Sequence, residues 1–150
     1  MSSILLTSQL HDEKTFYQKF LTDLEACTKE VIIESPYITT ERMRTFDRIF
    51  HKLLKKGIKI YIITRDPKEH ELGMEAESED AITWCEMLGV QVLLCVGNHH
   101  RKLAILDRKI TWEGSLNILS QTWSREIMRR IEGQELALQM FNFLKLAKFL

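Results

Sequence analysis

Three short apolar runs alternate with helical patterns, and this alternation limits the possible folds more than any other feature of the chain. The runs cover residues 31–35, 58–64 and 90–96, and each has the length of a buried strand. The predicted N-caps of three helices are Asp12, Thr40 and Ser78, and the predicted ends of the second and third helices are Gly57 and Gly89. This order predicts an α/β fold, in which an α/β/α layered domain has a mixed central β-sheet flanked by helices.

The second half of the chain continues with a predicted hairpin, a strand and a helix. Residues 101–106 and 110–112 are β-prone and are separated by a short polar turn. Residues 126–131 predict a last strand, and residues 134–150 predict a C-terminal helix. This helix is apolar around most of its circumference, so we expect it in the core or in a dimer interface, with membrane contact as the alternative.

The composition is that of an ordinary globular protein. The chain has 150 residues, of which 45% are hydrophobic and 28% charged, and its formal net charge is zero. We therefore expect residues 1–150 to form a single domain, and whether it was excised from a longer chain stays open. Residues 66–86 carry eight acids against one base, and residues 65–77 are predicted to form a long loop. Residues 100–130 carry seven bases against three acids, which weakly favours an anionic substrate.

Cysteine usage and hydropathy favour a reducing compartment. Cys27, Cys85 and Cys95 are odd in number and have no C-x-x-C spacing, so no disulfide framework is expected. The N-terminal apolar run, residues 4–6, has no basic residue before it and does not predict a signal peptide. No apolar stretch has the length of a membrane span, and a cytoplasmic protein is the expectation.

The densest group of polar, chemically active residues lies between the third strand and the last. His100 and Lys102 alternate onto one face of the predicted strand. If the chain reverses after this strand, Ser115 and Asn117, which follow Gly114, return beside them. An imidazole, an ammonium, a hydroxyl and an amide would then share a small area. These groups predict a site that binds an oxyanion.

The spacing H-x-K-x4-D, formed by His100, Lys102 and Asp107, resembles the HKD motif of the phospholipase D-like superfamily. The Gly-Ser-x-Asn sequence that ends at Asn117 extends the resemblance. Glu126 stands where the family carries the glutamate of N-x-E, whereas Ser124 departs from the usual asparagine. The order of strands and helices is also the one that this family shows. The resemblance implies a phosphodiesterase of the single-motif, nuclease type.

The resemblance assigns a role to each residue of the motif. In the family a histidine attacks the phosphorus and becomes a phosphohistidine, so His100 is the expected nucleophile, with Glu126 orienting its ring. Lys102 would bind a non-bridging phosphate oxygen, together with the neutral donors of Ser115 and Asn117. Asp107 and Gly114 would have structural roles in the turns. No metal and no other cofactor is implied.

Further basic and aromatic side chains suggest a contact surface for nucleic acid. A rim that follows phosphates and stacks bases could form from the following residues: Arg125, Arg129, Arg130, Trp112 and Trp123. His99 alternates onto the face opposite His100, which predicts a structural or exposed position. Cys95, His99 and His100 match no zinc spacing, and His70 is expected to be solvated.

The chain contains one copy of the motif, although the family mechanism uses two histidines. This count predicts a twofold homodimer with one composite active site, or pairing with another motif-bearing domain. The expected activity is that of a metal-independent nuclease, an endonuclease with DNA favoured over RNA as substrate. The alternatives are a phospholipase or phosphatidyltransferase acting on phospholipid headgroups, and a non-catalytic nucleic-acid-binding or dimerisation module.

Overall fold

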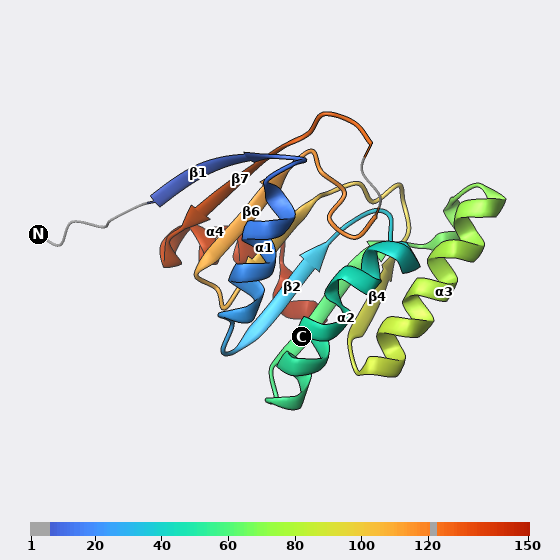
Figure 1. Cartoon of the computed structure of the whole chain (residues 1–150), viewed down its shortest axis with the longest axis horizontal. Coiled ribbons are helices and arrows are strands. Elements are labelled where there is room, and N and C mark those ends of the chain that lie inside the picture. The colour runs from blue at the N-terminus through green and yellow to red at the C-terminus, as the bar shows by residue number, and fades with distance from the viewer. Residues whose placement is uncertain (1–6, 121–122) are drawn as a thin grey trace, which may run out of the picture.

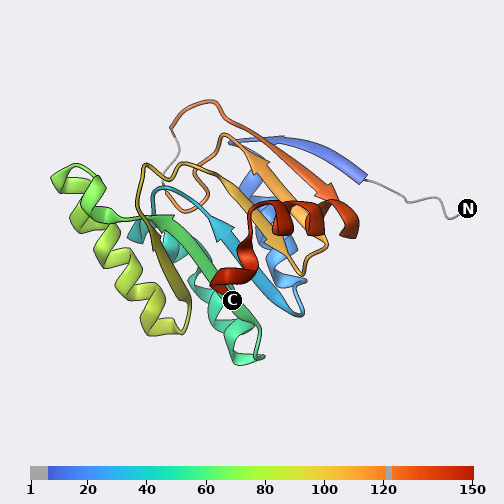
Figure 2. The same cartoon turned by 180° about the vertical axis from the view of Figure 1, so that it is seen from behind.

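A seven-stranded mixed sheet with helices on both faces forms the protein, in a computed structural model that describes residues 7–120 and 123–150. The predicted α/β/α layering is confirmed (Figures 1 and 2). The strands are β1 (Thr7–Asp12), β2 (Glu30–Glu34), β3 (Lys59–Arg65), β4 (Gln91–Cys95), β5 (Leu103–Leu106), β6 (Ile110–Gly114) and β7 (Ile127–Glu132). The helices are α1 (Phe16–Glu25), α2 (Thr40–Lys55), α3 (Leu72–Leu88) and α4 (Gln134–Phe143), with short 3₁₀ segments η1 (Pro67–Glu69) and η2 (Leu146–Phe149). The N-terminal apolar run at residues 4–6 lies outside the described residues.

The sheet has the order β1-β7-β6-β5-β2-β3-β4. β2, β3 and β4 are parallel, and the connections through α2 and α3 join them. The pairs from β2 through β5, β6 and β7 to β1 are antiparallel. A short turn connects β5 to β6. β2 lies between β3, the next strand in the chain, and β5, which comes later in the sequence.

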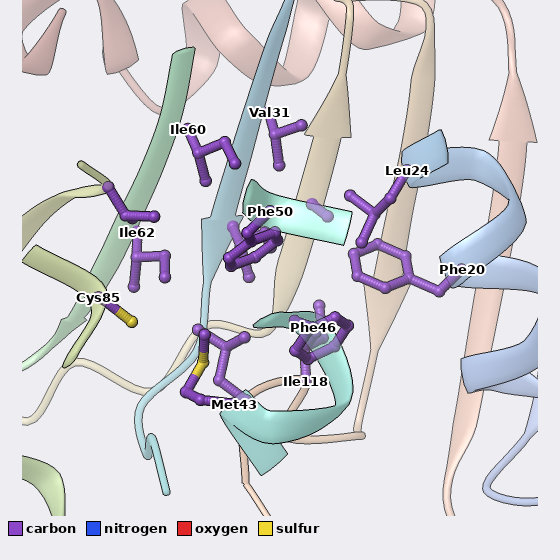
Figure 3. Close-up of a cluster of buried hydrophobic side chains, with 14 of the residues drawn as sticks. Phe20, Leu24, Val31, Met43, Phe46, Phe50, Ile60, Ile62, Cys85 and Ile118 are labelled. Atoms are coloured by element: carbon purple, nitrogen blue, oxygen red, sulfur yellow. The ribbon is translucent and has the colours of Figure 1, made fainter. Parts of the chain in front are cut away.

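Helices α1, α2 and α3 cover one face of the sheet, and α4 with η2 covers the other (Figures 1 and 2). Alternate residues of β2 enter these two cores, Val31 and Ile33 on the first face and Ile32 on the second. Because β2 is buried on both faces, it has the unbroken apolar run of a central strand. Figure 3 shows two phenylalanines of α2 in the first core, Phe50 on the side of Val31 and Ile60 and Phe46 beside Ile118.

The starts of all three predicted helices differ from the expectation. Asp12 is the last residue of β1 and accepts from the backbone N–H groups of Lys14 and Thr15, so it stabilises the turn before α1 and does not cap it. The cap of α2 is Thr39, whose side chain accepts from the Arg42 N–H, and Thr40 is already helical. A serine or threonine just before a helix and one at its first position give the same sequence pattern. The pattern therefore does not tell which of two neighbouring residues is the N-cap.

The predicted loop at 65–77 is wrong over its second half. α3 already begins at Leu72, and Ser78 is a fully buried residue inside the helix and not its cap. The residues of the first two turns include glutamate and alanine, which are good helix formers on an exposed face. Ser78, Ala81, Ile82 and Cys85 form the buried side of the helix at the expected spacing.

The C-terminal segment is shorter as a helix than predicted. α4 ends at Phe143, and Lys145 takes a left-handed conformation with φ of 54° before η2. This bend lets Ala137, Phe141 and Leu146 enter the second core. No helix in the described part of the chain is long and apolar enough to cross a membrane.

Candidate active site

His100 and Lys102 lie in the segment that enters β5, at the end of the sheet where β2 and β3 also end. The predicted strand 101–106 is shorter, because pairing begins only at Leu103. Lys102 Nζ donates to His100 Nδ1 over 2.7 Å and to the His100 carbonyl over 3.1 Å. The imidazole is exposed. The ammonium and the imidazole predicted to act together are therefore in direct contact.

Ser115 is held at the start of the loop after β6 by the facing strand. Its N–H donates to the Ile127 carbonyl over 2.9 Å, and its Oγ accepts from the Ile127 N–H over 3.0 Å. Gly114 allows this approach, since a Cβ at Gly114 would lie 2.1 Å from the Ile127 carbonyl oxygen. A side chain at this position would push apart the two strands that carry Ser115 and Glu126.

Asn117 follows in a loop that is anchored by buried neighbours. Leu116 and Ile118 are fully buried on either side of it, and the Tyr17 hydroxyl donates to the Ile118 carbonyl over 2.8 Å. Asn117 Oδ1 is buried and has no hydrogen-bond partner among the described residues. The amide is thus held in place by its backbone, and its buried oxygen has an unused acceptor position.

Glu126 is close to Lys102 but does not contact His100. Its carboxylate accepts from the Ser124 hydroxyl, and this bond, a second one from Ser115 and the charge of Lys102 hold its pKa below the usual range. Burial lowers the pKa of Lys102, and the nearby Glu126 opposes that shift. Ser124, which stands where the family usually has asparagine, therefore donates its hydroxyl to the Glu126 carboxylate. The predicted role of Glu126 in orienting His100 stays a prediction.

The environment of His100 favours its neutral form. Partial desolvation of the exposed His100 ring lowers its pKa below the usual value, and the charges of Lys102 and Arg65 lower it further. Arg65 ends β3 and donates to Asn98 Oδ1 over 2.8 Å, two residues before His100. It also donates to Glu69 over 3.2 Å, and Glu69 accepts from the Gly97 N–H. Arg65 is not among the site residues predicted from the sequence. An arginine at the end of an apolar strand is nevertheless a sequence signal for a cation at that edge of the sheet.

Replacing Arg65 with glutamine should raise the pKa of His100 toward its ordinary value. The shift should be partial, because burial and Lys102 still act on the ring. The protonated fraction of His100 near pH 6 would then increase. An NMR titration of the His100 ring measures the shift directly. Arg48→Gln, an exposed change on α2, is the matched control and should leave the pKa unaltered. An unchanged titration in folded Arg65→Gln would contradict the assignment.

Asp107 lies at the opposite end of β5, in the turn before β6. Its carboxylate accepts from the backbone N–H groups of Thr28, Lys29 and Glu30 over 2.8 to 3.0 Å. Its φ of 54° is left-handed, a conformation that aspartate adopts more readily than most residues. Asp107 therefore ties the β5–β6 turn to the start of β2 and does not reach His100.

The predicted nucleic-acid rim is only partly available. Arg130 is buried, and its guanidinium donates to both carboxylate oxygens of Asp23 over 2.7 and 2.9 Å. Trp112 is also buried and donates to Asp23, so neither residue can contact nucleic acid. Both side chains alternate toward the core face of β7 and β6. Arg125 and Trp123 are exposed, and Arg129 is exposed but donates to the Ser8 hydroxyl over 2.6 Å.

No group of three or more His, Cys, Asp or Glu residues within 7–120 and 123–150 is arranged to hold a metal ion. All three cysteines are free. His99, predicted to be structural or exposed, turns away from His100 and lies 2.8 Å from the buried Glu34. The expectation that His70 is solvated is wrong: its ring packs against Tyr37, and both ring nitrogens are buried with no hydrogen-bond partner among the residues that the structure describes.

A pocket of about 750 Å³ opens beside His100 and Lys102 on the face that α4 covers. One wall is the end of the sheet, and the other consists of side chains of α4, among them Met140 and Phe143. Phe143 is 80% exposed. The imidazole and the ammonium thus lie beside a largely apolar pocket, and the Glu126 carboxylate lies near the ammonium.

A family model described as "Cardiolipin synthase, PLD-like domain" matches residues 20–145, which is most of the chain. The chain belongs to the phospholipase D-like family. Phospholipase D-like proteins are phosphodiesterases, and the matched region contains every residue of the motif from His100 to Glu126. No sequence among the curated proteins matches the chain significantly.

Solved phospholipase D-like structures share the fold at low sequence identity. NucT from Helicobacter pylori is 18% identical with a TM-score of 0.72, and 94% of each chain is covered. Nuc from Salmonella typhimurium, a phospholipase D family member, is 14% identical with a TM-score of 0.76, over 94% of this chain and 93% of that one. Phosphatidylserine synthase from Haemophilus influenzae is 15% identical with a TM-score of 0.72, over 98% of this chain but 39% of that one.

Proposed function

We propose that the protein is a metal-independent nuclease that hydrolyses phosphodiesters of DNA, or of RNA, through a covalent phosphohistidine at His100. The observation that carries the proposal is the direct contact of Lys102 with His100, beside Ser115 and Glu126. These groups can bind a phosphate, attack it and stabilise the charge that develops on its oxygens. The low pKa of His100 supports a ring that is neutral, as a nucleophile must be.

The reaction would proceed in two displacements. In the first, His100 Nε2 forms a bond to phosphorus, the bond from phosphorus to the leaving oxygen breaks, and a second, protonated histidine gives its proton to that oxygen. In the second, the same histidine takes a proton from water, whose oxygen attacks phosphorus and breaks the P–N bond. The two steps return both histidines to their starting states.

Lys102 would move between two partners during this cycle. Its ammonium donates to His100 Nδ1, so a neutral ring in this state carries its proton on Nε2 and cannot attack through that atom. A bound phosphate would draw Lys102 from the ring. The proton could then reside on Nδ1, with Glu126 as acceptor and the Nε2 lone pair free. The low pKa of Glu126 keeps this acceptor charged.

The second histidine would come from a second copy of the chain, because the sequence contains one H-x-K-x4-D motif. The pocket beside His100 supports this assembly. Its α4 wall is apolar and Phe143 is 80% exposed, as expected for a surface that another protomer covers. A twofold axis near His100 would bring two such sites together and bury both α4 faces.

Two observations bear on the substrate. The single-domain neighbours Nuc and NucT are nuclease-type members and match this chain over nearly their whole length, which supports a nuclease. The exposed Arg125 and Trp123 lie in the loop before Glu126, where they could contact a phosphate and a base. The second candidate is a phospholipase or phosphatidyltransferase, which the phosphatidylserine synthase neighbour and the apolar pocket favour. A non-catalytic binding module is the third, and the assembled site argues against it.

A substrate panel in EDTA tests the proposal. We expect the wild-type protein to cleave single- or double-stranded DNA, or RNA, and bis(p-nitrophenyl) phosphate at the same rate with and without chelator. Release of headgroup from phospholipid vesicles without cleavage of nucleic acid would replace the nuclease with the lipid enzyme. Loss of activity on chelation would contradict the metal-independent mechanism, and turnover of no substrate in the panel would leave the binding module.

A further inference from the structure

A buried carboxylate lies directly behind the segment that carries His100. Glu34 is the last residue of β2, and none of its surface is exposed. Its Oε1 lies 2.8 Å from His99 Nε2 and accepts from Arg101 Nε over 2.9 Å. Its Oε2 is buried and has no hydrogen-bond partner in the described part of the chain. Among the described residues, His99 and Arg101 are the two whose side chains contact this carboxylate.

A buried carboxylate such as that of Glu34 contributes little to the stability of the fold. Removing a carboxylate from water is costly, and its pairing with a cation often only offsets that cost. An apolar side chain at the end of β2 would fit the second core, which contains Ile32 and Leu103 nearby. A buried ion pair of this kind favours one conformation over others, because only one arrangement satisfies it.

The conformation that the Glu34 contacts would favour is that of the segment on both sides of His100. His99 and Arg101 turn toward Glu34, whereas His100 and Lys102 turn away from it and contact each other. Residues 98–102 belong to no strand, and the backbone bond from β6 to this stretch, from the Gly114 N–H to the Lys102 carbonyl over 3.4 Å, lies two residues after His100. Two side chains held at one buried oxygen restrain the segment instead: Arg101 donates to Glu34 Oε1, and His99 Nε2 lies 2.8 Å from the same oxygen.

We propose that Glu34 is a positioning residue for His100, which holds His99 and Arg101 so that the imidazole stays on the side of the segment that carries Lys102 and faces the substrate. The inference rests on the proposed function, since it assigns a role in the same reaction. Glu34 itself contacts no reacting atom. Its effect should appear in turnover and not in substrate binding, because a misplaced nucleophile lowers the rate of attack on bound substrate.

The groups around Glu34 come from three further elements. His99 and Arg101 lie on the segment before β5, Cys95 ends β4, and Lys148 belongs to η2. Burial raises the pKa of the Cys95 thiol, Glu34 raises it further, and Arg101 and Lys148 oppose that rise. Of these groups, the two in contact with the Glu34 carboxylate are the two that flank His100.

The first test is Glu34→Gln, which keeps the shape of the side chain and removes its charge. We expect a folded protein whose kcat for bis(p-nitrophenyl) phosphate falls about 10- to 100-fold while KM changes less than about twofold. The matched control is Glu30→Gln, at the other end of the same strand. Glu30 also accepts from an arginine, Arg108, over 2.6 Å, but away from His100. Its kcat should equal that of the wild type.

The titration of His100 provides a readout independent of turnover. If Glu34 acted only through its charge, its removal would lower the pKa of His100. If it positions the ring, its removal frees the ring from Lys102 and from burial, and the pKa should rise. NMR measures this shift even if no substrate is turned over, so failure of the proposed function and failure of this inference can be told apart.

Arg101→Gln covers the case in which Glu34→Gln does not fold. The Arg101 side chain is 45% exposed, so water can replace it at Glu34. We expect a smaller fall in kcat and a rise in the pKa of His100 in the same direction. The double variant should be no slower than Glu34→Gln alone, since both changes break one network. A folded variant of either kind with wild-type kcat and wild-type His100 titration would overturn the proposal.

Discussion

Replacing His100 with alanine should reduce phosphodiester hydrolysis at least about 1,000-fold and leave the fold intact. The change removes both the nucleophile and, if the site is shared, the proton donor of the partner copy. The side chain is exposed and its hydrogen-bond contacts are with Lys102, so its loss should not lower the free energy of unfolding appreciably. Steady-state rates and a urea unfolding curve measure the two effects.

His51→Ala is the control for this variant. His51 is an exposed histidine on α2, so the same substitution there should leave hydrolysis unchanged. Hydrolysis at the wild-type rate in His100→Ala would refute the nucleophile assignment.

Mixtures of the two proteins test the shared site. If one reaction needs His100 from both chains, only pairs of two wild-type chains are active. Co-refolding equal amounts of wild type and His100→Ala should then leave about one quarter of the activity of an all-wild-type sample. Independent sites would leave about one half. A linear dependence on the wild-type fraction would contradict the composite dimer, whatever the oligomeric state in sedimentation.

Replacing Gly114 with alanine should destabilise the protein by about 3 kcal/mol and impair catalysis in the molecules that stay folded. The added Cβ would lie 2.1 Å from the Ile127 carbonyl oxygen and 2.9 Å from the Met128 Cα. Both neighbours are backbone atoms, so β6 and β7 must separate to make room. That movement breaks the two hydrogen bonds between Ser115 and Ile127 and displaces Glu126.

Gly73→Ala is the matched control for this prediction. Gly73 lies in the first turn of α3, and a Cβ there would meet nothing within 4 Å. Alanine is the better helix former, so this change should leave stability equal or slightly increased. Urea unfolding of the two variants gives the comparison, and kcat per folded molecule gives the effect on the site. A Gly114→Ala protein as stable as the wild type would show that the two strands are not as close as described.

The sheet illustrates which parts of the fold could be predicted. β2 and β3 are mostly buried, β4 is a half-exposed edge strand, and the apolar runs of all three stand out in the sequence. β1 was missed, because all but one of its six residues are exposed and no apolar alternation marks it. Its only sheet neighbour, β7, lies more than a hundred residues away in the chain. The strand exists because of that pairing and not because of its own composition.

The residues of the candidate site could be predicted because they are local in sequence. His100 and Lys102 are two positions apart, and a single hairpin returns Gly114, which precedes Ser115, to the Lys102 carbonyl. The spacing of the motif therefore reflects the geometry of one β-turn and its two strands. Local geometry of this kind needs no knowledge of the rest of the fold.

The sequence by itself determined which chemical groups can meet at the end of β5, and the tertiary structure decided which charges remain available there. Arg130 and Arg125 are both arginines close to the motif in sequence. The Arg130 guanidinium, however, is paired with Asp23, 107 positions away, and is not available to a ligand. Arg101 is bound to Glu34, 67 positions away. Ion pairs across a sheet depend on which strands lie side by side and which face each residue takes, and sequence spacing carries neither kind of information.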